Sequence, residues 1–266
     1  MIKDEYFTLY NGVTIPKVAL GTWQSSPSDA YNAVISAIKA GYTHIDTALV
    51  YGNEEAVGRA IKDSKIERDK LFVTTKCPAE VKTYEGALES FNTSIKNLGL
   101  DYIDLYLIHA PWPWSEMGKN CDEGNIEVWK AFIKLYNEKK IRAIGVSNFS
   151  PHDVKNVWDA TGFKPMVNQI RYFVGYTQKE CTDYCDKNSI LVEAYSPLAT
   201  GSIVNDERFK GLEAKYNKSI PQILIRFCLE NNRLPLPKSV HEERIISNID
   251  LDFKISKEDM EYLNSL

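Results

Sequence analysis

The chain has 266 residues, of which 44% are hydrophobic and 26% are charged, as is ordinary for a globular domain. Its net charge of −4 disfavours nucleic acids and anionic membranes as partners, because both require a basic face. The N-terminus carries no apolar run typical of a signal peptide, and no stretch is apolar over the length of a membrane span. We therefore expect a soluble, cytoplasmic protein.

The five cysteines do not indicate a disulfide framework, because their number is odd and their spacing is wide. Cys181 and Cys185 lie four residues apart on an expected helix and could share a face. We interpret them as two small buried thiols, since no further histidine or cysteine completes a set of metal ligands. No metal site is expected.

The predicted elements begin with a hairpin within residues 6–18, where Asn11-Gly12 separates two β-prone runs. From Val18 onward, short apolar strands alternate with helices. The strands are predicted at 18–20, 43–46, 71–76, 103–109, 141–146, 166–169, 190–195 and 234–236. The helices are predicted at 28–40, from 54 through 62, at 83–98 and 125–139, from 151, at 178–187, in the segment up to 231, at 242–249 and from 256.

Eight strands in strict alternation with helices indicate a parallel sheet, because parallel neighbours need a crossover connection. For a chain of this length, a closed (β/α)8 TIM barrel fits better than an open, doubly wound sheet. We find no linker and predict one barrel domain over residues 1–266. From its position, the hairpin is expected to plug the N-terminal end of the barrel.

Active sites of such barrels lie at the C-terminal ends of the strands. Four titratable side chains are predicted there, on three successive strands: Asp46, Tyr51, Lys76 and His109. A neighbouring ammonium should lower the pKa of a tyrosine, and Asp46 could supply the counter-charge that a buried Lys76 needs. His109 could orient a carbonyl oxygen through a hydrogen bond. Such a set would protonate an oxygen while a hydride arrives at its carbon.

The segments that carry these residues resemble the aldo-keto reductase family in sequence and in order. The matching motifs are Gly41-Tyr-Thr-His-Ile-Asp-Thr-Ala with Tyr51-Gly-Asn-Glu-Glu, Leu71-Phe-Val-Thr-Thr-Lys76, Asp101-Tyr-Ile-Asp-Leu-Tyr-Leu-Ile-His109, Ile144-Gly-Val-Ser-Asn-Phe149, Val167-Asn-Gln-Ile170, Glu193-Ala-Tyr-Ser-Pro-Leu198 and Leu236-Pro-Lys-Ser-Val240 with Glu243-Arg244. They extend over nearly the whole chain.

The resemblance implies a barrel with an N-terminal hairpin that reduces aldehydes and ketones with NADPH. It assigns Tyr51 as the general acid, Lys76 and Asp46 as the residues that tune it, and His109 as the residue that orients the carbonyl. Further residues are expected to contact the cofactor: Ser147, Asn148, Gln169, Tyr195, Ser196, Leu198, Lys238, Ser239, Arg244 and Asn248. Trp23 and Trp112 are expected to form the substrate pocket with Tyr51 and His109. A monomer acting on a small carbonyl compound follows from this interpretation.

A physical argument also supports the assignment of three of these residues to a pocket for the 2′-phosphate. Lys238, Ser239 and Arg244 place two cations and a hydroxyl within seven residues, which suits a dianionic phosphate. Such a pocket is compatible with the absence of a Gly-x-Gly-x-x-Gly motif from the chain.

Two segments depart from the family pattern. Arg171–Val174 replaces the usual acid, aromatic, histidine and proline, and predicts an altered surface near that loop. Ala110 replaces the tryptophan that usually follows His109, and Trp112 and Trp114 lie further along the loop Pro111–Gly124. Because this loop lines the substrate pocket in relatives, the substrate is left open. The short C-terminal tail resembles microbial members and suggests an open site.

Two other functions are compatible with parts of the sequence. A nucleotide-binding sensor or regulatory subunit would bind NADPH tightly with little turnover, and the unusual Arg171–Val174 segment would serve a partner. A metal-dependent hydrolase would use His44, Asp46 and His109 as ligands, but Lys76 and the lack of a His-x-His pair disfavour it. His44 is better explained as a core residue.

Overall fold

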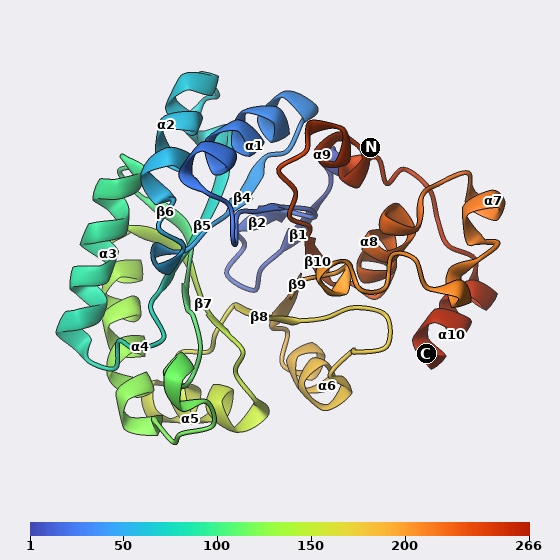
Figure 1. The fold of residues 1–266 in the computed structure, drawn as a ribbon. Coiled ribbons are helices and arrows are strands. Elements are labelled where there is room, and N and C mark those ends of the chain that lie inside the picture. The colour runs from blue at the N-terminus through green and yellow to red at the C-terminus, as the bar shows by residue number, and fades with distance from the viewer.

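A parallel sheet of eight strands forms the centre of the computed structural model, which describes residues 1–266 (Figure 1). The strands follow one another around the sheet in chain order. They are β3 (Leu20–Gly21), β4 (His44–Asp46), β5 (Phe72–Cys77), β6 (Ile103–Ile108), β7 (Ile141–Ser147), β8 (Val167–Arg171), β9 (Leu191–Tyr195) and β10 (Leu234–Leu236). The predicted (β/α)8 barrel is confirmed.

The barrel closes between its first and last strands. The N–H of Ala19 donates to the carbonyl of Pro235 at 3.2 Å, and the N–H of Gly21 donates to that of Pro237 at 3.0 Å. A Cβ on Gly21 would lie 3.3 Å from the carbonyl oxygen of Leu236, so the lack of a side chain favours this close approach.

Ten α-helices connect or follow the strands, and those of the first half form an outer layer beside β4–β7 (Figure 1). The helices are α1 (Pro27–Ala40), α2 (Glu54–Ser64), α3 (Tyr84–Leu98), α4 (Asp122–Asn137), α5 (Pro151–Thr161), α6 (Lys179–Lys187), α7 (Leu212–Tyr216), α8 (Ile220–Glu230), α9 (Glu242–Ile249) and α10 (Lys257–Ser265). None of them is both long enough and apolar enough to cross a membrane.

Local sequence explains where these helices begin and end. In α1, the Ser26 side chain accepts a hydrogen bond from the N–H of Asp29, Pro27 occupies the first turn, and Gly41 ends the helix at a φ of 100°. Helix α4 begins three residues before its predicted start, and β8 continues two residues beyond its predicted end. The longer β8 brings Arg171 into the sheet.

The predicted hairpin is formed by β1 (Tyr6–Thr8) and β2 (Thr14–Pro16). The Asn11 side chain donates to the carbonyl of Arg142 at 3.1 Å, near the start of β7. The Tyr10 hydroxyl donates to the carbonyl of Lys164, just before β8. Because these acceptors lie at the N-terminal ends of parallel strands, the hairpin covers that end of the barrel, as expected.

Two hydrophobic cores support the barrel. The larger lies within the sheet and between the sheet and its helices, and the smaller lies beneath α7, α8 and α10. Tyr172 and Val174 belong to the smaller core and are 3% and 2% exposed. The prediction that Arg171–Val174 is an altered surface is therefore wrong for these two residues, because their side chains pack into the smaller core.

Candidate active site

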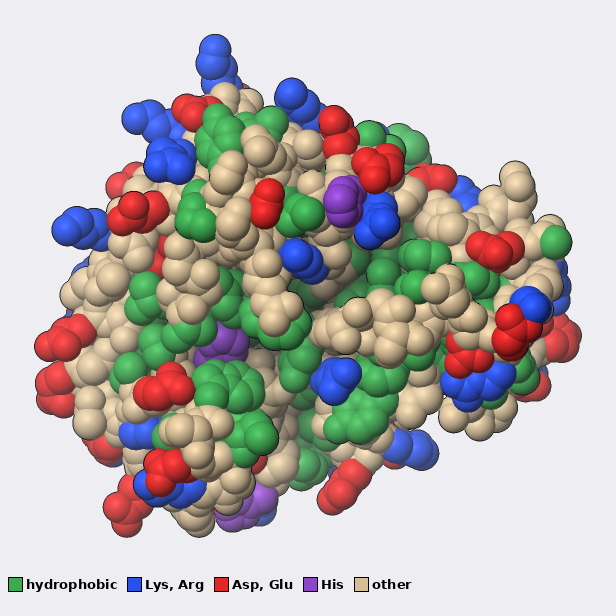
Figure 2. All heavy atoms as spheres, in the orientation of Figure 1, with side chains coloured by type: hydrophobic (Ala, Val, Ile, Leu, Met, Phe, Trp, Pro, Cys, Tyr) green, Lys and Arg blue, Asp and Glu red, His purple; other side chains and the backbone are tan.

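A cleft of about 1090 Å³ opens at the C-terminal ends of the strands. Its lining includes Gly21 of β3, Asp46 of β4, Ser147 of β7, Gln169 of β8 and Tyr195 of β9. Figure 2 shows the molecular face with this hollow near its middle and hydrophobic side chains along its margins. The site therefore lies at the end of the barrel opposite the hairpin.

Lys76 is the centre of the polar cluster at the bottom of this cleft. Its ammonium is fully buried and donates to Asp46 Oδ1 at 2.7 Å, to the Thr47 carbonyl at 2.8 Å and to the Tyr51 hydroxyl at 3.4 Å. The structure thus brings together the predicted cation, counter-charge and tyrosine. A buried ammonium with three acceptors has its hydrogen-bonding capacity satisfied.

Burial dominates the protonation of the tyrosine. It raises the pKa of Tyr51 above its ordinary value, against the opposing charge of Lys76 and with a further upward contribution from Asp46. The expectation that Lys76 brings this pKa below its ordinary value is wrong for the protein alone, because desolvation outweighs the ammonium. Burial also opposes the charge on Lys76, but Asp46 and Tyr51 outweigh it, so the pKa of Lys76 is raised. Tyr51 is consequently a protonated hydroxyl beside a charged ammonium.

His109 stands next to Tyr51 at the bottom of the cleft. The two ring centroids are 5.6 Å apart, and the His109 ring makes no side-chain hydrogen bond to protein. Burial, with a smaller contribution from Lys76, lowers the pKa of His109 to about 3. The imidazole is therefore neutral at physiological pH and free to hydrogen-bond with a ligand.

Gln169 and Glu193 extend the cluster into the barrel. The Gln169 amide donates to Asp46 Oδ2 at 2.8 Å and to Glu193 Oε2 at 2.7 Å. The other oxygen of Glu193 is buried without a partner, and burial, followed by the charge of Asp46, raises the pKa of Glu193 to about 8. Glu193 is not among the predicted site residues, and the pairing of β8 with β9 is what places it opposite Gln169 and beside Asp46.

A second polar group lies between β7 and β9. The Tyr195 hydroxyl donates to Asn148 Oδ1 at 2.8 Å, while Asn148 Nδ2 donates to the His109 carbonyl at 3.1 Å. Asn148 adopts a left-handed φ of 60°, which asparagine tolerates better than most residues. Ser147 Oγ donates to the Gln169 carbonyl at 2.8 Å. Because Asn148 Nδ2 also donates to Ser147 Oγ at 3.1 Å, four of the predicted cofactor residues form one connected group.

The predicted phosphate pocket occupies another part of the same cleft. Lys238, Ser239, Arg244 and Asn248 all line it, as do Ser196 and Leu198. Neither Lys238 nor Arg244 has a carboxylate partner within ion-pair distance. Two free cations beside a hydroxyl suit a dianionic phosphate group, so the residues present fit NADPH.

The aromatic part of the site differs from the prediction. Trp23 lines the cleft as expected, but Trp112 does not. Trp114 takes its place, with its ring 5.5 Å from that of His109 and 5.2 Å from that of Trp112. The short 3-10 helix at Trp114–Glu116 presents this ring to the site, and its position could not be deduced from residue spacing in a long loop.

Several lining residues have no sequence signal. Thr200, Val204 and Ser219 lie between β9 and α8, Pro221 lies in the first turn of α8, and all four line the cleft. None is titratable and none belongs to a recognised motif, so only the tertiary structure places them at the site.

His44 and Asn53 have structural roles. His44 is fully buried, its Nε2 lies 2.9 Å from Thr74 Oγ1, and burial lowers its pKa to about 3, in agreement with the prediction of a core residue. Asn53 stands at the N-cap of α2 but its side chain makes no cap hydrogen bond. Instead its amide donates to the carbonyls of Thr22 and Ser25, which ties the loop after β3 to that after β4.

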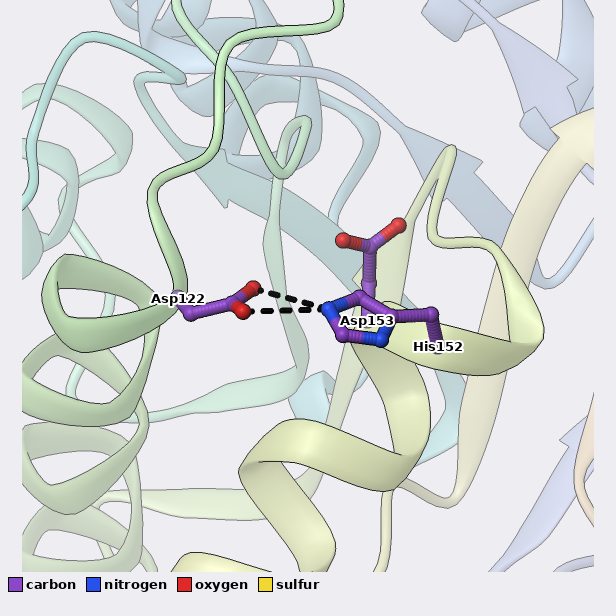
Figure 3. A group of neighbouring side chains, drawn as sticks. All are labelled: Asp122, His152 and Asp153. Atoms are coloured by element: carbon purple, nitrogen blue, oxygen red, sulfur yellow. Dashed lines mark hydrogen bonds and ion pairs between the residues drawn. The ribbon is translucent and has the colours of Figure 1, made fainter.

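One group of possible metal ligands lies at the surface rather than in the cleft. Asp122, His152 and Asp153 meet where α4 and α5 begin (Figure 3). His152 Nε2 lies 3.0 Å from Asp122 Oδ2, and Asp153 completes the capping box with Ser150. The hydrogen bond and the capping box at the starts of these two helices explain why the three side chains are neighbours.

Comparisons with known proteins agree with this geometry. The family model for the Aldo/keto reductase family matches residues 17–266. Glyoxal reductase of Bacillus subtilis is 43% identical over 260 residues, which cover 97% of this chain and 91% of that protein. Methylglyoxal reductase DkgA of Escherichia coli is 36% identical over 263 residues, which cover 98% of this chain and 92% of that protein.

Solved structures that are similar to this chain are also aldo-keto reductases. An aldo-keto reductase from a Medee basin deep-sea metagenome library has a TM-score of 0.91 at 45% identity, with 97% of this chain and 94% of that chain covered. The Bombyx mori aldo-keto reductase in complex with NADP has a TM-score of 0.89 at 35% identity, with 98% and 92% covered.

The fold and the comparisons first define the class: this protein is an oxidoreductase built on a (β/α)8 barrel. More particularly, the chain belongs to the aldo/keto reductase family.

Proposed function

We propose that this enzyme reduces aldehydes and ketones to alcohols with NADPH, and that Tyr51 is its general acid. The observation that carries the assignment is Lys76, a fully buried ammonium that contacts both Asp46 and the Tyr51 hydroxyl at the bottom of a large cleft. A tyrosine that contacts a fixed cation can release its proton to a substrate oxygen, because the cation stabilises the phenolate.

The proposed reaction divides the work between the cofactor and the protein. When bound, NADPH supplies a hydride to the carbonyl carbon. His109, neutral and free of protein partners, donates a hydrogen bond that orients the carbonyl oxygen toward Tyr51. The Tyr51 hydroxyl then gives its proton to that oxygen, and Lys76 stabilises the resulting phenolate until solvent reprotonates it.

The remaining residues would hold the cofactor. Ser147, Asn148 and Gln169 present side chains for a carboxamide, and Tyr195 offers a ring on which a flat heterocycle can stack. Ser196 and Leu198 follow Tyr195 along the cleft, and Asn248 completes its far end. Lys238, Ser239 and Arg244 would bind the 2′-phosphate.

The substrate class is proposed from the open cleft and the named relatives. Those relatives are glyoxal and methylglyoxal reductases, so we expect methylglyoxal to be among the carbonyl compounds that this enzyme reduces. We further propose that residues 1–266 act as one domain and as a monomer, without nucleic acid as a partner. Light scattering in solution measures the oligomeric state.

The test is NADPH oxidation, followed by absorbance, with a panel of aldehydes, aldoses, α-keto esters and diketones. The Tyr51→Phe variant should lose about 10³-fold in kcat, a loss within the range for removal of a general acid, while NADPH binding changes little. Unchanged turnover would exclude Tyr51 as the acid. If the unaltered protein binds NADPH but oxidises it with no compound, the sensor interpretation is favoured.

A further inference from the structure

Arg171 stands at the mouth of the barrel, where the chain departs from its family pattern. It is the last residue of β8 and pairs with Tyr195 of β9. Side chains two residues apart on a strand face the same way, so Arg171 is on the same side as Gln169, which reaches Asp46 inside the barrel. Arg171 accordingly lines the cleft.

The guanidinium of Arg171 has no anionic partner within the protein. It makes neither a side-chain hydrogen bond nor an ion pair, and lies 5.3 Å from the centre of the Phe173 ring. The Phe173 ring in turn stacks on Tyr176, with 5.5 Å between centroids. The aromatic pair therefore supports the guanidinium while leaving its hydrogen-bond donors free.

Arg171 lines the same cleft as Tyr51 and His109 of the proposed reaction centre. Burial raises the pKa of Tyr195 to about 12, the positive charge of Arg171 opposes this shift, and Tyr51 adds to it. Both side chains thus lie within electrostatic reach of the Tyr195 hydroxyl. That hydroxyl is bonded to Asn148, which is bonded to the His109 carbonyl.

The charges along the cleft leave one cation without a role. Asp46 is the only carboxylate in its lining, and Lys76 neutralises it. Among the cations of the lining, Lys238 and Arg244 are assigned to the cofactor phosphate. Arg171 is the remaining cation, and it lies on β8, whereas Lys238 and Arg244 follow β10. Its guanidinium has the planar arrangement of donors that matches a carboxylate.

We propose that Arg171 binds the carboxylate of substrates that carry one in addition to the carbonyl group, and so directs the enzyme toward oxo-acids. The inference rests on the proposed carbonyl reduction and adds a substrate class to it. Arg171 is a specificity-determining residue in this assignment and takes no part in the chemical step.

The test compares 4-carboxybenzaldehyde with its methyl ester, methyl 4-formylbenzoate, which lacks the negative charge and adds one methyl group. In the Arg171→Gln variant we expect KM for the carboxylate to rise about 10-fold, or about 1.4 kcal/mol, with kcat nearly unchanged. KM for the ester should change less than about twofold, because it offers no charge to the guanidinium. Arg171→Lys should fall between, since it keeps the charge but loses the bidentate geometry.

Two controls separate this effect from others. Lys179→Gln removes an equally positive but exposed side chain of α6, which pairs with Asp183 outside the cleft lining, and should leave both KM values unchanged. NADPH affinity, measured by fluorescence titration in the absence of substrate, should be the same in Arg171→Gln as in the unaltered enzyme.

Three results would overturn the assignment. Equal changes in KM for acid and ester would show that Arg171 does not recognise charge. A weakened NADPH affinity as the main effect would place Arg171 at the cofactor. Loss of selectivity in Lys179→Gln would point to net charge alone. If the unaltered protein reduces neither aldehyde, the proposed function itself fails, which is distinguishable from turnover of both without discrimination.

Discussion

At the scale of single residues, burial determines the protonation of the groups around Lys76. Burial and the negative charge of Asp46 outweigh the attraction of Lys76 for a second carboxylate, that of Glu193. Glu193, reached from Asp46 through the Gln169 amide, consequently keeps its proton to a higher pH than an exposed glutamate. A low local dielectric makes each such charge costly unless it is paired.

Replacing Lys76 by Met should destabilise the protein and abolish turnover. Asp46 would remain buried without its cation, at a cost of about 3–5 kcal/mol in the free energy of unfolding. The double variant Lys76→Met with Asp46→Asn removes both charges and should regain much of that stability but no activity. Urea unfolding together with NADPH oxidation measures both effects. Recovery of activity in the double variant would contradict the role given to the ammonium.

Glu193 should make stability depend on pH. Its pKa rises from an ordinary 4.5 to about 8 on folding, so the folded state prefers the protonated carboxyl. Between these two values stability falls as pH rises, by at most about 1.4 kcal/mol per unit, and the full penalty is present above the folded pKa. Glu193→Gln should remove this slope, because the neutral amide still offers an oxygen to Gln169. Denaturant unfolding at several pH values tests this, and parallel curves for the two proteins would contradict it.

At the scale of elements, the loop between β6 and α4 sets the shape of the substrate end. Its 3-10 helix, Trp114–Glu116, places the Trp114 ring against His109 and at the cleft surface. Trp112 packs edge-on against that ring, with 5.2 Å between the centroids, and does not line the cleft. The two tryptophans form a matched pair for mutagenesis.

Trp114→Ala should weaken binding of aromatic aldehydes more than that of methylglyoxal. Loss of one aromatic contact is worth about 1 kcal/mol beyond its buried area, so KM for benzaldehyde should rise about 5- to 10-fold. Trp112→Ala should have a smaller effect on the same KM. Steady-state kinetics with benzaldehyde and methylglyoxal tests this prediction. A larger rise of KM for benzaldehyde in Trp112→Ala than in Trp114→Ala would mean that the loop presents the Trp112 ring to substrate.

At the scale of the whole molecule, the cofactor should hold together parts of the chain that are distant in sequence. The cleft combines residues after β3 with residues of α9, so a ligand that spans it binds the folded state alone. Binding then stabilises the fold by mass action.

NADPH at about 100 times its Kd should add about 2.7 kcal/mol to stability and raise Tm by about 5–10 °C. The double variant Lys238→Met and Arg244→Met should lose most of this shift with NADPH but little with NADH, which lacks the 2′-phosphate. Differential scanning fluorimetry with each nucleotide measures the shift in Tm. Equal losses with both nucleotides would remove these cations from the phosphate pocket.

The sequence alone determined the barrel, because strand and helix periods alternate clearly and local signals mark the ends. Helix α9 has the predicted bounds, and the Asn11-Gly12 hairpin forms where expected. The sequence also placed Asp46, Tyr51, Lys76 and His109 at strand ends, where a parallel barrel must bring them to one rim.

Only the tertiary structure decided what depends on distance and solvent. Burial, which a sequence does not state, reverses the expected pKa direction of Tyr51 and keeps Glu193 protonated. Loop conformation selects Trp114 over Trp112. The altered segment is divided at the end of β8: Arg171, its last residue, lines the cleft, whereas Tyr172, the next residue, packs into the smaller core. Alternation along a strand is local, but which face meets the site is a property of the closed sheet.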